Sequence, residues 1–290
     1  MSAHDSALGI SGDAGNAWLA VCRECTAAVR RVLEELPTRA EREPGLGTGE
    51  GGDETTAVDA AAELAVVGVL ERLRVGFTLV SEELGERVYG DGSSSLRIVV
   101  DPIDGSVNAK RLIPCFALSI AVAEGETMDD VVFGYVHDFG SGEEWTATAG
   151  GARLNGEPLA GPLPKNEIEL LSFEATRTEL IAETIGAFVG LAERTRVIGS
   201  LALSLCHLAA GRFDAVISLK PIRSVDIAAA QLLVRGRGLA IDLPEDPPFG
   251  SARLDVVGRS RVVAARTPER CAELYAALSS ALPIEQSRRS

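Results

Sequence analysis

Aromatic side chains are scarce in this sequence. They make up 4% of its 290 residues, while apolar residues as a whole make up 46%, so small and aliphatic side chains must fill the core. A chain of this length is long enough for one large α/β domain or two fused lobes. No run of 18 apolar residues without a charge occurs, so no membrane span is predicted. The first 16 residues show no basic segment followed by an apolar run, so no signal peptide is predicted.

Basic residues are outnumbered: 28 Lys and Arg stand against 42 Asp and Glu, which gives a formal net charge of −14. Proteins whose main role is to bind nucleic acid or an anionic membrane need a basic face, so this balance argues against both roles. An acidic protein can still bind phosphate, but it then needs a bridging cation or a locally basic pocket.

Cysteine and histidine are also rare. Five cysteines with irregular spacing do not make a disulfide framework, and a reducing cytoplasm is the expected compartment. Cys22 and Cys25 form a CxxC pair inside a predicted helix. No second pair or nearby histidine completes a zinc site there, so plain packing is favoured. The three histidines, at positions 4, 137 and 207, lie beside none of the motifs described below.

Apolar periodicity predicts an N-terminal α+β lobe, residues 1–160, and a more regularly alternating α/β lobe, residues 161–290. The predicted helices are 17–36, 59–73, 179–191, 201–210, 225–234 and 268–282. The predicted strands are 77–80, 96–100, 116–123, 131–136, 144–148, 170–174, 196–198, 215–219, 239–242 and 262–265.

Residues 38–55 are polar and rich in glycine, and they are predicted to form an exposed loop. Within this loop, Gly47–Gly52 matches the pattern GxGxxG, which binds a dinucleotide only where it follows a strand and opens a helix. The preceding segment 38–44 is no strand, so the dinucleotide interpretation is rejected. For residues 45–53 we keep the hypothesis of a lid over the site described next.

Carboxylates stand where predicted apolar strands end. Glu82 follows strand 77–80, Asp101 follows strand 96–100, and Asp226 opens a predicted helix. Ligands of α/β folds bind at strand ends. A carboxylate after a buried run is costly to bury unless it is paired or bound to a cation. Because Mg²⁺ prefers oxygen ligands, this arrangement indicates a shared site for a hard cation.

The turn Asp101–Ser106 carries the densest chemistry. Its two carboxylates, three residues apart and stiffened by a proline, can reach one centre, and the carbonyl of Ile103 can add a further oxygen. Gly105 lacks a Cβ where a phosphate would approach, and the N–H groups of Gly105 and Ser106 are predicted to face that anion. The same sequence also occurs as a plain surface turn with a capping Asp. Its place after an apolar strand, together with Glu82, favours the cation site.

These residues resemble the inositol monophosphatase superfamily, and the resemblance covers nearly the whole chain. In pattern the chain is most similar to the archaeal-type inositol monophosphatase/fructose-1,6-bisphosphatase branch. The motifs that carry the resemblance are Thr56–Asp59 with Glu63, Ser81–Glu83, Asp101–Asn108, Gly199–Ser200 and Val225–Ala230. The resemblance implies a layered α-β-α-β-α sandwich of the sugar phosphatase type. It also implies a Mg²⁺-dependent phosphomonoesterase acting on a small sugar or polyol phosphate, and a homodimer.

The resemblance also implies residue roles. Two to three Mg²⁺ ions would be held by Glu82, Asp101, the Ile103 carbonyl, Asp104 and Asp226, and one ion would acidify the attacking water while another stabilises the leaving alkoxide. Ser106, hydrogen-bonded to Asp59, would orient that water, and Glu82 would share in catalysis. The implied substrate-binding residues are Gly105, Ser106, Gly199, Ser200, Lys110, Arg111, Lys220 and Arg223.

Departures from the animal-type pattern bear on the substrate. Leu219 stands where those enzymes carry a Glu that contacts inositol, and Val225 stands where they carry a Trp. Four cations flank the motifs, namely Lys110, Arg111, Lys220 and Arg223, although each is equally explained as a solvated surface charge. We therefore expect a sugar phosphate or bisphosphate rather than inositol 1-phosphate alone. A nucleotide 3′-phosphatase of the same superfamily and a non-catalytic sugar-phosphate-binding relative are the alternatives.

Overall fold

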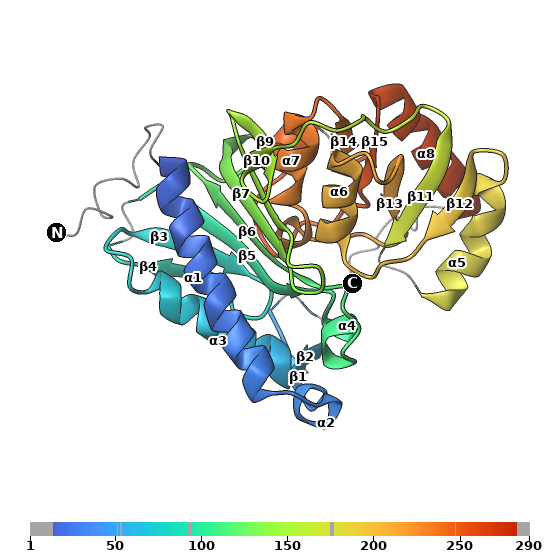
Figure 1. The fold of residues 1–290 in the computed structure, drawn as a ribbon. Helices are drawn as coiled ribbons and strands as arrows, with labels where there is room; N and C mark the ends of the chain where they lie inside the picture. The colour runs from blue at the N-terminus through green and yellow to red at the C-terminus, as the bar shows by residue number, and fades with distance from the viewer. Residues whose placement is uncertain are drawn as a thin grey trace.

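The computed structural model describes residues 14–282 except 51, 53, 92–93, 175–176 and 247. Helices and sheets alternate in five layers (Figure 1). Helices α1 (Ala14–Glu35) and α3 (Ala57–Leu70) cover one face of an eight-stranded sheet. Helices α6 (Leu201–Ala209) and α7 (Ala230–Gly236) lie between that sheet and a five-stranded one. The predicted α-β-α-β-α sandwich is therefore confirmed.

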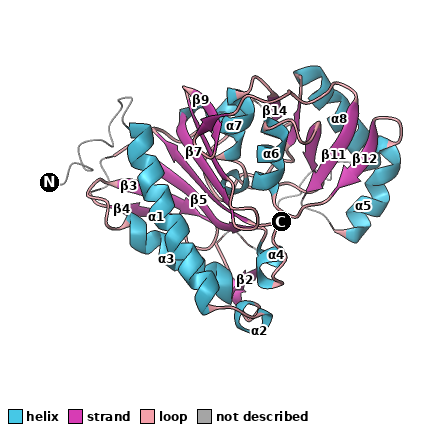
Figure 2. Cartoon of the chain, viewed as in Figure 1, coloured by secondary structure: helices cyan, strands magenta, loops and turns pink. Residues whose placement is uncertain are grey.

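The other described helices form the outer layer and the connections between layers. Figure 2 shows α5 and α8 on the outer side of the smaller sheet. The remaining α-helices are α2 (Arg39–Arg42), α4 (Ser106–Lys110), α5 (Thr178–Thr184) and α8 (Pro268–Ala281). The 3₁₀ turns are η1 (Met128–Asp130), η2 (Ile185–Phe188), η3 (Ser224–Asp226) and η4 (Phe249–Ser251). No helix in the described part of the chain is long and apolar enough to span a bilayer.

The larger sheet has the strand order β10-β9-β8-β7-β6-β5-β3-β4. Its strands are β3 (Phe77–Ser81), β4 (Gly85–Tyr89), β5 (Arg97–Asp104), β6 (Ala117–Ala123), β7 (Val131–Asp138), β8 (Glu144–Thr148), β9 (Gly151–Leu154) and β10 (Glu157–Pro158). All neighbours pair antiparallel except β3 and β5, which run parallel. The parallel pair brings the carboxyl ends of β3 and β5 to the same edge of the sheet.

The smaller sheet has the strand order β12-β11-β13-β15-β14. Its strands are β11 (Ile168–Glu174), β12 (Ala192–Arg196), β13 (Ala215–Ser218), β14 (Ala240–Asp242) and β15 (Val263–Ala265). Strand β11 pairs parallel with both neighbours, whereas β15 pairs antiparallel with both of its own. The division into lobes 1–160 and 161–290 stays a prediction.

Strand β5 shows why an apolar run forms a central strand here. All eight of its residues are buried, because helices cover both faces of the sheet. Side chains alternate between the faces: Ile98 and Val100 pack into the core under α1 and α3, while Val99 packs into the core under α6 and α7. A third core lies between the smaller sheet and α8.

Four sequence predictions are wrong in detail. Residues 38–55 are not a plain loop, since they contain α2 and the hairpin of β1 (Gly45–Thr48) and β2 (Glu54–Thr56). The strand expected at 196–198 lies instead at 192–196, because its parallel register with β11 places Ala192 beside Ile168. Two expected helices are split: 179–191 into α5 and η2, and 225–234 into η3 and α7.

Candidate metal centre

Three carboxylates meet at the edge of the larger sheet. Glu82, Asp101 and Asp226 each offer one oxygen, and these oxygens all lie within 4.8 Å of one another. The parallel register pairs Ser81 with Val100, so the next residue of each strand, Glu82 or Asp101, reaches the same place. Asp226 arrives from η3, where its Oδ2 accepts the backbone N–H of Arg223 at 2.8 Å.

Burial makes this group costly without a cation. Desolvation is the main reason why the pKa of Glu82 is raised to about 8. The charge of Arg223 lowers this pKa in part, and repulsion from Asp226 raises it. Desolvation also raises the pKa of Asp101 well above its usual range, and the charges of Glu82 and Asp104 raise it further. A bound cation would relieve both penalties, because it favours the ionised carboxylates. This set of oxygen donors therefore fits a hard divalent cation.

Asp104 lies outside this compact trio but inside its electrostatic field. Burial raises the pKa of Asp104 to about 7, with Asp226 among the charges that raise it. Its Oδ2 accepts the Ser200 hydroxyl at 2.5 Å and the backbone N–H of Ala202 at 2.7 Å. Asp104 therefore also holds the first turn of α6.

Gly105 is required by the backbone. Its φ is +98°, and a Cβ there would lie 3.0 Å from the carbonyl oxygens of both Cys115 and Gly199. Close packing of three backbone segments is therefore one reason for this glycine, and the approach of a phosphate stays a prediction. Ile103 lies near the end of β5, where its N–H donates to Asp101 Oδ1 at 3.0 Å.

The expected hydrogen bond between Asp59 and Ser106 is not formed. The Ser106 hydroxyl instead donates to the Ile103 carbonyl at 3.1 Å. Asp59 Oδ2 accepts the hydroxyl and the N–H of Thr56, at 2.5 and 3.1 Å, as part of the capping box of α3. Asp59 Oδ1 is buried with no hydrogen-bond partner, which leaves one acceptor open.

The four predicted cations fall into different settings. Lys110 and Arg111 end α4, and Arg111 lies 3.9 Å from Glu43. Lys220 is exposed and lines a cavity of about 330 Å³, together with Gly52, Pro221, Ile222, Arg223, Asp226 and Arg259. Arg223 is buried, and its Nη2 lies 2.5 Å from Glu82 Oε1. Only Lys220 and Arg223 of the four therefore line the cavity that contains Asp226.

The inositol monophosphatase family model matches residues 17–283. The chain belongs to the inositol monophosphatase family. A fructose-1,6-bisphosphatase/inositol-1-monophosphatase of Archaeoglobus fulgidus is 32% identical over 253 residues, which cover 85% of this chain and 92% of that protein. The Nus factor SuhB of Escherichia coli is 33% identical over 235 residues, covering 78% and 85%.

Solved structures of family members agree with the fold. The crystal structure of an inositol monophosphatase-fructose 1,6 bisphosphatase superposes with a TM-score of 0.77 at 25% identity, covering 90% of this chain and 99% of that one. Extragenic suppressor protein SuhB from Bartonella henselae superposes with a TM-score of 0.74 at 25% identity, covering 90% and 98%. These findings confirm the prediction of a phosphatase of this family that is similar to the archaeal-type inositol monophosphatase/fructose-1,6-bisphosphatase branch.

Sequence reasoning missed one buried carboxylate of this family member. Glu174, at the end of β11, accepts the N–H groups of Ile198 and Gly199 at 3.2 and 2.9 Å and the hydroxyl of Ser204 at 2.6 Å. Burial raises its pKa, and these donors lower it in part. Because Gly199 and Ser200 donate to Glu174 and Asp104, they position the turn before α6. Glu174 follows an apolar strand as Glu82 does, and that was its available signal.

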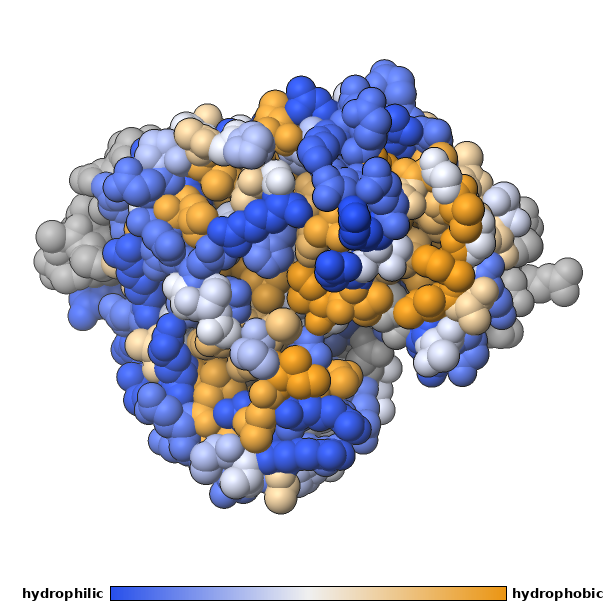
Figure 3. Space-filling view, turned by 45° about the vertical axis from the view of Figure 1, so that its right-hand side comes forward, coloured by the Kyte–Doolittle hydropathy of each residue, from blue (hydrophilic) through white to orange (hydrophobic). Residues whose placement is uncertain are grey.

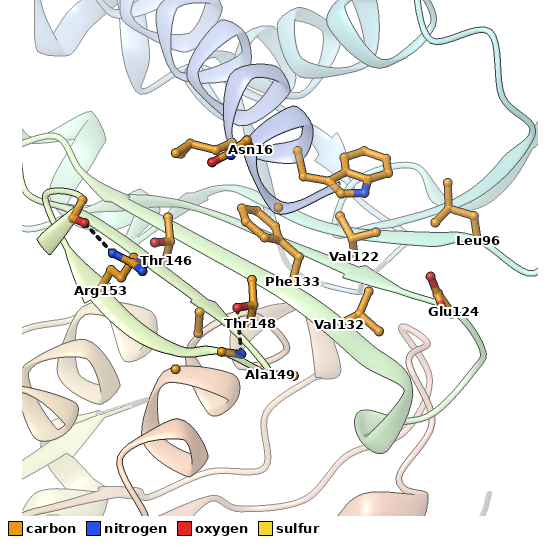
Figure 4. A pocket seen from close by; sticks show the side chains of 17 residues that line it. Asn16, Leu96, Val122, Glu124, Val132, Phe133, Thr146, Thr148, Ala149 and Arg153 are labelled. Carbon is orange, nitrogen blue, oxygen red and sulfur yellow. Dashed lines mark hydrogen bonds between the residues drawn. The ribbon is translucent and has the colours of Figure 1, made fainter. Parts of the chain in front are cut away.

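One predicted position and one cavity lie away from the clustered carboxylates. Leu219, where the animal-type pattern has its inositol-contacting Glu, is fully buried in the core under α8. Another cavity, of about 830 Å³, lies between the start of α1 and the larger sheet. Figure 4 shows Asn16, Phe133 and Arg153 around it, and it contains none of the clustered carboxylates.

Proposed function

We propose that this chain is a Mg²⁺-dependent phosphomonoesterase that hydrolyses a small sugar or polyol phosphate, such as inositol 1-phosphate or fructose 1,6-bisphosphate. One observation carries the proposal: three carboxylates gather, largely buried, in a member of the inositol monophosphatase family, and one of them, Asp226, lines an open cavity. Glu82, Asp101, Asp226, Asp104 and the Ile103 carbonyl would hold the cations. Bound Mg²⁺ would supply Lewis-acid stabilisation of developing negative charge and a lowered pKa for water.

The chain's own groups would prepare the reaction. Asp59 Oδ1, which has no hydrogen-bond partner, would take a proton or a hydrogen bond from water. Ser106 would have to exchange its Ile103 acceptor for Asp59 to act with it, and one hydrogen bond of 3.1 Å is what it gives up. Glu174 and Asn108 would keep the turns around Gly105 and Gly199 together, since the Asn108 amide donates to the carbonyls of Cys115 and Ile198.

The cavity beside Asp226 supports a substrate with more than one anionic group. Lys220 and Arg259 line it from two separate loops, and the Archaeoglobus fulgidus relative named above carries fructose-1,6-bisphosphatase in its name. Lys110, Arg111, Gly105, Gly199 and Ser200 stay predicted substrate-binding residues. The homodimer, the cytoplasmic location and the lid role of residues 45–53 also stay predictions, although Gly52 lines this cavity.

Phosphate release with Mg²⁺ tests the proposal. The panel is inositol 1-phosphate, fructose 1,6-bisphosphate and 3′-phosphoadenosine 5′-phosphate, and we expect turnover of at least one of the first two. The variant Asp101→Asn should lower kcat/KM by about a thousand-fold, since a lost ligand forfeits several kcal/mol of charge stabilisation. Because the substitution removes a buried like charge, the metal-free variant should be at least as heat-stable as the unaltered protein.

The outcomes separate the alternatives. Turnover of the nucleotide alone would favour the 3′-phosphatase, and no turnover by a folded, metal-binding protein would favour the non-catalytic relative. Full activity in Asp101→Asn would overturn the proposed site.

A further inference from the structure

Arg223 stands among the carboxylates rather than at a free substrate face. Its side chain is only 9% exposed. Nη2 lies 2.5 Å from Glu82 Oε1 and 3.8 Å from Asp226 Oδ1. Its backbone N–H also donates to Asp226 Oδ2 at 2.8 Å, and this hydrogen bond fixes the backbone from which the side chain extends.

The guanidinium is a permanent cation. Arginine does not deprotonate in proteins, and its planar group suits carboxylates. Its charge favours the ionised forms of both Glu82 and Asp101, which desolvation and mutual repulsion disfavour. Arg223 therefore offsets part of the charge that the trio would otherwise concentrate in one place.

The same carboxylates are those offered to a metal. Glu82 Oε1 contacts the guanidinium, while Glu82, Asp101 and Asp226 make up the compact donor set. Arg223 lies near Glu82 and Asp226. A divalent cation bound to these two carboxylates would repel the guanidinium, because the two charges would be close together and poorly solvated. That repulsion would favour movement of the guanidinium away from Glu82 when a metal binds.

We propose that Arg223 is an internal counter-cation that divalent metal displaces from Glu82, so this residue trades metal affinity against the stability of the metal-free protein. The cavity of about 330 Å³ that Arg223 lines gives the released guanidinium room. The inference rests on the proposed function only in taking the trio as a metal site. It replaces the expected role of Arg223 as a plain substrate ligand with exchange at the metal ligands.

Calorimetric titration of the metal-free, full-length protein with Mg²⁺, and with Mn²⁺ as a second probe, tests the exchange. Arg223→Gln should bind metal at least about tenfold more tightly, because no resident cation must be displaced. It should also melt at a lower temperature than the unaltered protein when metal is absent. Lys220→Gln is the matched control: it removes one positive charge from the same cavity but from an exposed side chain, and its affinity should change by less than about threefold.

A spectroscopic measurement covers the case in which Arg223→Gln does not fold without metal. The Nε–H signal of Arg223, identified by its loss in Arg223→Lys, should move during metal titration of the unaltered protein and reach its end point with calorimetric saturation. An unmoved signal would overturn the proposal. So would an affinity in Arg223→Gln that is unchanged, weaker, or raised only as much as in Lys220→Gln.

The two proposals fail separately. Metal exchange without phosphatase activity would leave this inference intact and remove the proposed function. An active phosphatase whose metal affinity does not depend on Arg223 would support the proposed function and remove this inference.

Discussion

Gly105 shows how one residue without a side chain can hold a reactive turn. Its φ of +98° favours glycine, and a Cβ would lie only 3.0 Å from the carbonyl oxygens of Cys115 and Gly199. The residue thus joins β5, the segment before β6 and the turn before α6. Its neighbours Asp104 and Ser106 depend on that junction for their positions.

We expect Gly105→Ala to destabilise the protein by about 2–4 kcal/mol, because the left-handed backbone alone costs an L residue about 1–2 kcal/mol and the two close contacts add to it. Urea unfolding at one pH measures this loss. Gly142→Ala is the control, since Gly142 also has positive φ, +77°, but a Cβ there would meet nothing within 4 Å. Equal losses in the two variants would show that the contacts at Gly105 contribute nothing.

At this scale the sequence predicts some residues and not others. Glu82 and Asp101 could be placed because each follows an apolar strand, and a parallel pair of strands brings both to one edge. The partner of Arg223 could not be predicted, since it is Glu82, 141 residues away. The Ser106 hydroxyl was assigned to Asp59, but a carbonyl three residues away in its own turn provides a nearer acceptor.

Helix α2 is an element that sequence reasoning mistook for loop. Its four residues include Arg42, which is 7% exposed and donates to the carbonyls of Leu33, Leu36 and Ala109. These acceptors lie at the end of α1 and in α4. A polar, glycine-rich composition gives no apolar periodicity, so a segment ordered by one buried arginine looks like a loop in the sequence.

We predict that Arg42→Met lowers the free energy of unfolding by about 2–4 kcal/mol. Methionine keeps the apolar part of the side chain but leaves three carbonyl groups without their hydrogen-bond donor. Chemical denaturation followed by circular dichroism is the measurement. Arg39→Met, on the same helix, removes only an exposed pair with Glu43 and should change stability little. If the two variants lose the same amount, Arg42 does not tie α1 to α4.

The layered fold as a whole was predictable, because its strands are apolar runs and its motifs stand at their ends. Figure 3 shows a surface that is polar for the most part with scattered apolar patches, in keeping with the acidic composition. What the sequence could not give is the extent of burial around the trio. That burial depends on how η3, which contains Asp226, packs beside β5, with which it is in contact.

Buried carboxylates with raised pKa values give the molecule a defined pH dependence. In the folded, metal-free protein Glu82 and Asp104 release their protons near pH 8 and 7, whereas in the unfolded chain they do so near pH 4. The folded state then holds more protons, so stability falls as pH rises through this range. Burial lowers the pKa of His137 and His207, which contribute the opposite slope, but that contribution fades within about one pH unit above the ordinary histidine pKa of about 6.5.

We therefore expect the melting temperature of the metal-free protein to fall between pH 6.5 and 8.5, by roughly 2–4 °C for each kcal/mol lost. Mg²⁺ should raise it more at pH 8.5 than at pH 6.5, because the metal competes with protons for the same oxygens. Thermal scans with EDTA or with Mg²⁺ across this range measure both effects. Asp101→Asn should flatten the metal-free slope and shrink the Mg²⁺ shift at pH 8.5. A Mg²⁺ shift that is independent of pH would mean that the cation binds away from these carboxylates.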